Sequence, residues 1–117
     1  MLIIGAGYAG KAVAVGIIED KIQYNAVEFL DNDDFKVGKK FLGIEAKDKS
    51  DNLEKFLESN KVDICVIAST SILKQDLEKL IKILNLNKIE IKIIPNMSQL
   101  MMSKNFFPQV KDFRREV

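Results

Sequence analysis

The sequence has no histidine, one cysteine and almost no excess charge of either sign. The absence of histidine excludes chemistry that needs an imidazole base or metal ligand from this chain. The single cysteine, Cys65, excludes a framework of internal disulfides, and we interpret it as a small buried side chain within a strand. The 18 basic and 17 acidic residues leave a net charge of +1. We therefore expect no nucleic-acid partner, because phosphate binding needs a concentrated positive field.

The chain also lacks a convincing membrane segment, although residues 1–18 are almost continuously apolar. No basic segment precedes this run, Lys11 interrupts it, and its glycines would weaken a spanning helix. A buried strand, a tight turn and a buried helix explain the same residues better. We expect no membrane contact by this segment and a cytoplasmic location.

Short apolar runs alternate with helical patterns along the 117 residues, a length that fits one domain. The expected strands are residues 1–4, 25–30, 41–46, 62–68 and 89–94. The expected helices are residues 8–20, a segment opening at residue 51, and the leucine-rich segment 73–84. Right-handed crossovers then favour an α/β, Rossmann-like three-layer fold with a parallel sheet of order 3-2-1-4-5.

Polar residues are expected to cap the ends of these helices. Asp51 and Glu54 have capping-box spacing at the start of the second helix. The hydroxyl-rich bend at residues 69–71 can cap the third helix. Asn85 or Asn87 can end that helix in a left-handed conformation.

The most informative motif is a G-x-G-x-x-G that directly follows a strand and opens a helix. Gly5 permits the tight turn, Gly7 lets a pyrophosphate approach the backbone, and Gly10 lets the helix pack close to the strand. The amides of the first helical turn, including those of Tyr8 and Ala9, then face the anion at the positive end of the helix dipole. The motif predicts a dinucleotide site, and a glycine-rich turn that binds nothing is the alternative.

Asp31 stands at the end of the second expected strand, where the motif requires an acid about 20 residues on to hold a ribose diol. Glu28 is its competitor, but it lies inside the strand. A carboxylate at this place favours a free 2′-hydroxyl, and hence NAD over NADP. The neighbouring Asn32 is a further candidate contact, although this part of the loop is equally compatible with solvated side chains.

Other candidate contacts follow the second and fourth expected strands. Ser69 and Thr70 end the fourth strand at the topological switch point, where their hydroxyls could touch phosphate or ribose. Lys36, Lys39 and Lys40 could neutralise phosphate, although solvated surface charge is the simpler interpretation. There is no nucleophile elbow, no suitably placed Tyr-x-x-x-Lys pair and no clustered metal ligand, so we expect neither catalytic residues nor a metal site.

Several segments together have a spacing more distinctive than any single motif. They are residues 2–10, 29–33, 37–39, 43–44, 51–53, 62–63, 66–68 and 93–95. On these segments the chain resembles the N-terminal Rossmann-like, CoA-binding-like domain of CapD/PglF-type polysaccharide-biosynthesis nucleoside-diphosphate-sugar epimerases and dehydratases. It departs from that family at residues 45–48, which replace the usual strand and glycine. This departure leaves open whether the short third strand near residue 44 forms.

This resemblance implies a larger parent protein, with membrane helices before the domain and a catalytic short-chain-dehydrogenase domain after it. The catalytic domain of such proteins removes water from a UDP-N-acetylhexosamine with tightly held NAD. Residues 1–117 would then be one excised nucleotide-binding domain, not catalytic alone, from a protein anchored in the inner membrane. Its implied partners are a nucleotide or nucleotide sugar and the downstream catalytic domain.

The tail at residues 97–117 carries methionine and phenylalanine among basic residues. It is expected to pack on the domain's own sheet, or to dock a neighbouring domain or subunit in a homo-oligomer. Two other functions also stay open: a non-catalytic oligomerisation or regulatory scaffold, and the UDP-sugar-binding domain of a sugar acyltransferase. CoA, or no ligand at all, is the alternative to NAD, because the family's label rests on analogy of fold.

Overall fold

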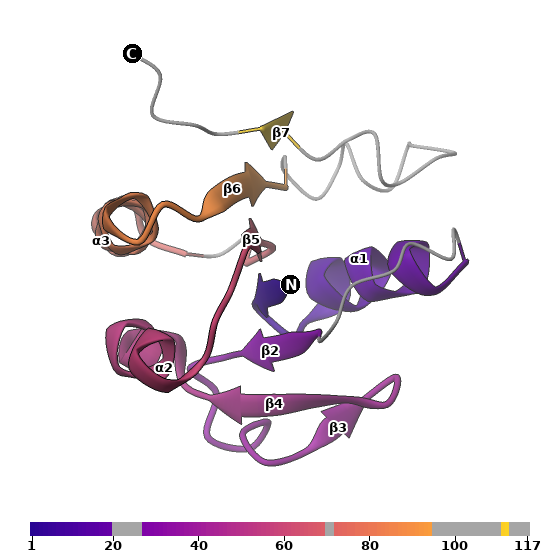
Figure 1. Ribbon diagram of the computed structural model, residues 1–117. Coiled ribbons are helices and arrows are strands. Elements are labelled where there is room, and N and C mark those ends of the chain that lie inside the picture. The colour runs from indigo at the N-terminus through magenta and orange to yellow at the C-terminus, as the bar shows by residue number, and fades with distance from the viewer. Residues whose placement is uncertain (20–26, 70–71, 95–110, 113–117) are drawn as a thin grey trace.

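The structure is a computed structural model that describes residues 1–19, 27–69, 72–94 and 111–112 (Figure 1). The expected packing of the tail at 97–117 therefore lies almost wholly outside the described residues. The elements in chain order are β1 (Leu2–Ile4), α1 (Tyr8–Glu19), β2 (Glu28–Leu30), β3 (Lys40–Phe41), β4 (Ile44–Asp48), the 3-10 helix η1 (Ser50–Asn52), α2 (Leu53–Ser59), β5 (Ile64–Ile67), α3 (Lys74–Leu86), β6 (Glu90–Ile93) and β7 (Lys111–Asp112).

The strands form one sheet of order β3-β4-β2-β1-β5-β6-β7. Its five inner strands, from β4 to β6, are parallel and have the expected 3-2-1-4-5 order, which confirms the Rossmann-like fold. The short strands β3 and β7 extend the two edges by antiparallel pairing. The pairing of β7 agrees with the expectation that the tail packs on the domain's own sheet, whereas β3 was not predicted as a separate strand.

The expected strand at 41–46 is instead part of a hairpin. Strand β3 pairs with β4 across a turn at Leu42 and Gly43, whose φ angles are 56° and 78°. Positive φ at both central residues belongs to the tight hairpin turn whose twist matches that of the strands. A leucine gives no signal for such a turn, so the pattern of apolar residues predicts one continuous strand there.

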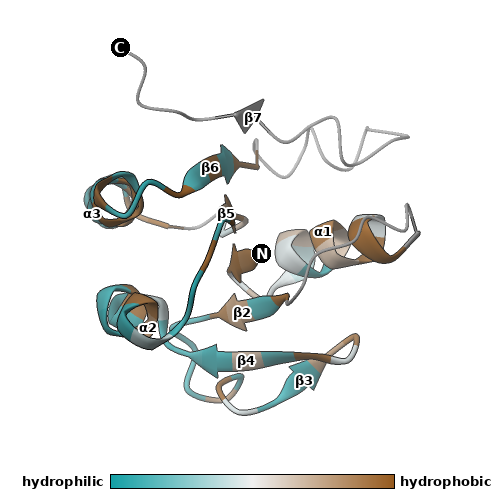
Figure 2. Ribbon diagram, in the orientation of Figure 1, coloured by the Kyte–Doolittle hydropathy of each residue, from teal (hydrophilic) through white to brown (hydrophobic). Residues whose placement is uncertain are grey.

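Helices cover both faces of the sheet, which gives the three expected layers. Helix α1 lies on one face, and α2 and α3 lie on the other (Figure 1). Strand β1 serves both cores: Ile3 packs with Val13 of α1, whereas Leu2 and Ile4 pack with Leu84 of α3. Figure 2 accordingly shows β1 as apolar, as expected for a strand buried on both faces. None of the helices within the described ranges is long and apolar enough to cross a bilayer.

The start of α2 differs from the predicted capping box. The 3-10 turn η1 precedes the helix, and the N-cap residue Asn52 makes no side-chain capping hydrogen bond. The carboxylate of Asp51 instead accepts a hydrogen bond from the side chain of Asn32, 3.3 Å away. The predicted pairing with Glu54 is therefore wrong, because a partner from another loop takes the Asp51 side chain.

The boundaries of α3 also differ from prediction. Its N-cap residue is Leu73, which makes no side-chain capping hydrogen bond. Of the hydroxyl residues expected to cap the helix, Ser69 lies four residues before this N-cap, and residues 70–71 lie outside the described residues. At its other end, the positive φ of 57° belongs to Lys88, whereas Asn87 has φ −94°. Asn87 ends the helix through its side chain, which donates to the carbonyl oxygen of Ile83 at 2.8 Å.

Cys65 is completely buried in β5, as predicted, and burial raises the pKa of its thiol. We expect native protein at pH 8 to resist iodoacetamide and unfolded protein to react as a free thiol, with mass spectrometry as the measurement. Because the folded pKa lies above the unfolded one, the stability from keeping the thiol neutral is complete below about pH 8.5 and declines as the pH rises. Rapid alkylation of the native protein would contradict this placement.

Candidate functional site

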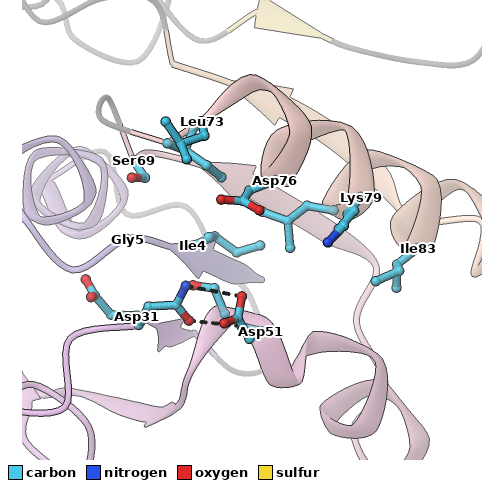
Figure 3. Close-up of a pocket in the computed structure, with 13 residues that line it drawn as sticks. Ile4, Gly5, Asp31, Asp51, Ser69, Leu73, Asp76, Lys79 and Ile83 are labelled. Carbon is cyan, nitrogen blue, oxygen red and sulfur yellow. Dashed lines mark hydrogen bonds between the residues drawn. The ribbon is translucent and has the colours of Figure 1, made fainter.

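The candidate site lies where the carboxyl ends of β1, β2 and β5 meet, at the switch point of the sheet. A pocket of about 360 Å³ opens there (Figure 3). Gly5 and Asp31, which directly follow β1 and β2, line it on the side of the sheet together with Ser69, the second residue after β5. Open α/β sheets bind ligands in the crevice at this position, and the pocket is large enough for a nucleoside.

The pocket has an apolar wall and a polar rim. The wall is formed by Ile4, Ile72, Leu80 and Ile83. The rim carries several oxygen acceptors and one cation, contributed by Asp31, Asn32, Ser50, Asp51, Ser69, Asp76 and Lys79. Figure 3 shows Asp76 and Lys79 on α3 across the pocket from Asp31 and Asp51. An apolar wall suits a planar base, whereas carboxylates suit hydroxyl groups and repel phosphate.

Two of the three motif glycines are required by the fold. Gly5 has φ 103°, and a Cβ on it would lie 3.0 Å from the backbone nitrogen of Ser69. A Cβ on Gly10 would overlap the carbonyl oxygen of Gly5 and lie 2.8 Å from its carbonyl carbon. Strand β1 and helix α1 can therefore approach this closely only without a side chain at residue 10.

Gly7 is the exception among the three, because neither its φ angle nor a close backbone neighbour among the described residues requires a glycine there. It is not among the glycines with positive φ. Among the described residues other than its two chain neighbours, the Nζ atom of Lys36 is the one atom within 4 Å of an ideal Cβ at this position, at 3.9 Å. The missing side chain therefore leaves the backbone accessible at the N-terminus of α1, which we call the mouth of the helix. The motif predicts the pyrophosphate at this place.

The N-terminus of α1 also offers amide donors that have no acceptor within the helix. The first hydrogen bond of its ladder runs from the nitrogen of Lys11 to the carbonyl oxygen of Gly7, at 3.0 Å. By helix geometry the N–H groups of Tyr8, Ala9 and Gly10 precede the ladder and have no acceptor within the helix. The first turn carries no acidic residue, so no local carboxylate offsets the positive end of the dipole.

Asp31 ties the end of β2 to the glycine loop. Its Oδ2 atom accepts from the backbone nitrogen of Ala6 at 2.7 Å, and its Oδ1 atom accepts from that of Asp33 at 2.8 Å. Each carboxylate oxygen can accept a second hydrogen bond, so the side chain can still take a ribose diol. Its competitor Glu28 forms an ion pair with Lys47 at 3.7 Å and is not a lining residue of the pocket.

The structure distinguishes one of the three candidate lysines. The Nζ atom of Lys36 lies 3.9 Å from the Oδ2 atom of Asp31, and the same nitrogen faces Gly7. Lys39 and Lys40 are exposed, as expected for solvated surface charges. The sequence alone could not separate these lysines, because their difference comes from the path of the loop between β2 and β3.

The remaining candidate residues are divided between the pocket and its surroundings. Asn32 and Ser69 line the pocket. The side-chain amide of Asn32 is already bonded to Asp51: its nitrogen donates to the carboxylate at 3.3 Å, and its oxygen accepts from the backbone nitrogen at 3.0 Å (Figure 3). Tyr8 is 65% exposed and does not line the pocket, Ala9 is buried in the core with Ile3, and Thr70 lies outside the described residues.

Sequence reasoning missed the wall that α3 contributes. The lining residues of this helix and its N-cap are Leu73, Asp76, Lys79, Leu80 and Ile83. The leucine periodicity predicted a buried face for this helix, but not that its first turns overhang the ends of the strands. That arrangement depends on the crossing of the helix over the sheet, which no local pattern encodes.

Replacement of Asp31 by alanine is expected to lower the free energy of unfolding by about 1–3 kcal/mol, because two backbone donors lose their acceptor. Asp34 is the matched control, since its carboxylate is 75% exposed and pairs only at the surface with Lys49, 2.8 Å away. Its alanine variant should lose at most about 1 kcal/mol. Urea unfolding measures both variants, and equal losses would show that Asp31 does not hold the loop.

Comparison with known proteins places this fold among domains of related architecture. The model of the family described as the CoA binding domain matches residues 1–98. The redox-sensing transcriptional repressor Rex 1 of Thermotoga maritima is 34% identical over 100 residues, which cover 80% of this chain and 48% of that protein. The chain thus spans about half the length of this curated relative.

Two solved structures have a similar fold. UDP-D-quinovosamine 4-dehydrogenase from Vibrio fischeri superposes with a TM-score of 0.75 at 24% identity, covering 97% of this chain and 92% of that chain. RSP, a Rex-family repressor, superposes with a TM-score of 0.65 at 26% identity, covering 80% of this chain and 44% of that chain. The first likeness supports the Rossmann-like architecture over nearly the whole chain.

Proposed function

The chain belongs to the CoA binding domain family of Rossmann-like nucleotide-binding domains, and from this premise we propose that it binds a dinucleotide of the NAD type. In this proposal it serves as an accessory domain of a UDP-N-acetylhexosamine dehydratase or epimerase in bacterial polysaccharide or glycan biosynthesis. The observation that carries the proposal is Gly7, a glycine that the fold does not need and that leaves the mouth of α1 open.

The two halves of an adenosine diphosphate have opposite requirements, and the site offers both. A pyrophosphate needs N–H donors and positive potential, which the first turn of α1 supplies beside Gly7. A nucleoside needs an apolar surface for its base and acceptors for its hydroxyls, which the pocket supplies. Asp31 stands between the two halves, since it bonds the glycine loop and lines the pocket.

The charge of the pocket favours NAD over both NADP and CoA. NADP carries a phosphate on the 2′-oxygen of its adenosine ribose, and CoA carries one on the 3′-oxygen. Either phosphate would approach the carboxylate of Asp31, whose side chain is only 15% exposed. Two like charges about 5 Å apart repel by roughly 3 kcal/mol at an effective dielectric constant of about 20. The family's name therefore does not predict the ligand of this member.

The parent enzyme would place its chemistry outside this domain. The likeness in fold to a UDP-sugar dehydrogenase and the resemblance of the sequence segments support a role beside a sugar-nucleotide catalytic domain. That domain would be the partner of this one in a protein anchored in the inner membrane. Residues 1–117 would be a single nucleotide-binding domain whose tail, from residue 97 on, leads to the partner.

A regulatory domain is the second candidate, supported by the 34% identity to a redox-sensing repressor. A nicotinamide dinucleotide suits this role as well, because it exists in an oxidised and a reduced form. The two candidates differ in what the site must distinguish. A sensor must bind NADH and NAD with different affinities, whereas an accessory nucleotide domain has no such requirement.

Calorimetry of the chain with NAD, NADH, CoA and UDP-N-acetylglucosamine tests the proposal. We expect saturable binding of a nicotinamide dinucleotide with a Kd in the micromolar range, which corresponds to about −8 kcal/mol. CoA and the UDP-sugar should bind at least about tenfold more weakly. Similar affinities for NAD and NADH would favour the accessory role, and a strong preference for one would favour sensing. Tighter binding of CoA, or no heat with either dinucleotide, would refute the proposal.

A further inference from the structure

In the part of the chain that the structure describes, the cation of Lys36 lies between Asp31 and the backbone of Gly7. The Nζ atom of Lys36 is 3.9 Å from the Oδ2 atom of Asp31 and 3.9 Å from the place that a Cβ of Gly7 would take. Its side chain is 30% exposed, so it is neither buried nor extended freely into solvent. Lys36 thus lies between Asp31, which lines the nucleoside pocket, and Gly7, where the pyrophosphate is predicted to bind.

The backbone of the loop fixes Lys36 in this place. The carbonyl oxygen of Asp33 accepts a hydrogen bond from the backbone nitrogen of Lys36 at 2.9 Å. The Oδ1 atom of Asp33 accepts another from the backbone nitrogen of Phe35, also at 2.9 Å. The carbonyl oxygen of Lys36 in turn accepts from the nitrogen of Lys39 at 3.0 Å. Asp33 is itself held by Asp31, so a chain of hydrogen bonds connects the lysine to the glycine loop.

We propose that Lys36 binds the pyrophosphate of the ligand and thereby leaves the carboxylate of Asp31 to the ribose. This inference rests on the proposed function and adds a phosphate-binding residue that the glycine motif does not contain. At 3.9 Å the contact between Lys36 and Asp31 is an ion pair too long to be a hydrogen bond, so the ammonium group can turn toward a phosphate without breaking one. The four-carbon stem of lysine allows this movement.

Electrostatics gives this lysine a second effect on the same ligand. The carboxylate of Asp31 is needed beside the ribose, but its negative charge repels the neighbouring phosphates. An ammonium group between the carboxylate and Gly7 offsets that repulsion, and it also donates charge-assisted hydrogen bonds. Lys36 would therefore matter for every ligand that carries a phosphate and hardly at all for a free nucleoside.

The test compares adenosine, ADP and NAD as ligands of the wild type, Lys36→Met, Lys36→Arg and the control Lys39→Met. Calorimetry measures the tighter complexes, and NMR chemical shifts measure adenosine. We expect Lys36→Met to weaken ADP and NAD about tenfold to hundredfold, the equivalent of one charge-assisted hydrogen bond. Adenosine binding should change by less than about twofold. Lys36→Arg should keep most of the affinity, and Lys39→Met, at an exposed site in the same loop, should behave as wild type.

Each alternative outcome has a distinct meaning. If Lys36→Met bound NAD as tightly as wild type, this inference would be overturned and the proposed function would stand. If it lost adenosine as strongly as NAD, Lys36 would act by supporting Asp31, and its role as a phosphate ligand would also be overturned. If the wild type bound none of the three ligands, both the proposed function and this inference would be refuted.

Discussion

Replacement of Gly10 by alanine is expected to cost the chain about 4 kcal/mol or more of its stability and to leave it largely unfolded. The added methyl group would overlap the carbonyl oxygen of Gly5, an atom of the backbone that cannot turn aside like a side chain. Relief requires α1 to move away from β1, which would open the core formed by Ile3, Ala9 and Val13. The loss therefore includes packing as well as the local clash.

Circular dichroism and urea unfolding measure this effect, with Gly7→Ala as the matched control from the same motif. A Cβ at Gly7 meets only the flexible end of Lys36, at 3.9 Å, so the control should unfold within about 1 kcal/mol of wild type. A Gly10→Ala variant as stable as the control would show that helix and strand do not approach each other as described.

Gly7→Val is expected to have the opposite effect, abolishing ligand binding while the fold remains intact. Its branched side chain would fill the open mouth of α1, so we expect the affinity for NAD to fall at least about hundredfold. The free energy of unfolding should change by less than about 1 kcal/mol, because Gly7 has neither positive φ nor a close backbone neighbour among the described residues.

Calorimetry with NAD and urea unfolding of the same preparation separate the two effects of Gly7→Val. Gly7→Ala, with one methyl group, should fall between the wild type and the valine variant in affinity. Wild-type affinity in the valine variant would mean that phosphate does not rest on this backbone, and the glycine would then need another explanation.

The architecture could be predicted from the sequence because its signals are local and repeated. Residues 2–4 are apolar without alternation, as a strand buried on both faces requires, and the glycine motif follows at once. The spacing of the later apolar runs and the rule of right-handed crossovers then fixed the order of the parallel strands. The position of Asp31 at the end of β2 was predicted in the same way, since its distance from the motif and its place after a strand are both visible in the sequence.

The details that failed depend on contacts between distant residues or on weak local signals. The hairpin turn places Leu42 at positive φ, where an aliphatic residue is rarely found. The capping box failed because Asn32, 19 residues away, engages Asp51. The special position of Lys36 depends on the folding of a loop against the glycine motif, and its two neighbouring lysines have the same chemistry in the sequence.

The division of the motif glycines has a practical consequence for sequence interpretation. Gly5 and Gly10 would be required in a glycine loop that bound nothing, because the backbone alone demands them. Gly7 is the motif glycine whose presence the proposed ligand would explain. A motif match therefore supports nucleotide binding chiefly through its middle glycine, and the structure identifies which substitution tests that meaning.

A titration of the ¹⁵N-labelled chain with NAD, followed by two-dimensional ¹H–¹⁵N NMR, tests the central claim most directly. The account predicts that the amide signals of Gly7, Tyr8, Ala9 and Gly10 shift together and saturate at a Kd in the micromolar range. The amides of Leu42 and Gly43, in the hairpin turn at the end of β4 away from the pocket, should move least. Saturable binding that leaves the signals of the glycine loop unmoved, or the absence of any shift at millimolar NAD, would contradict it.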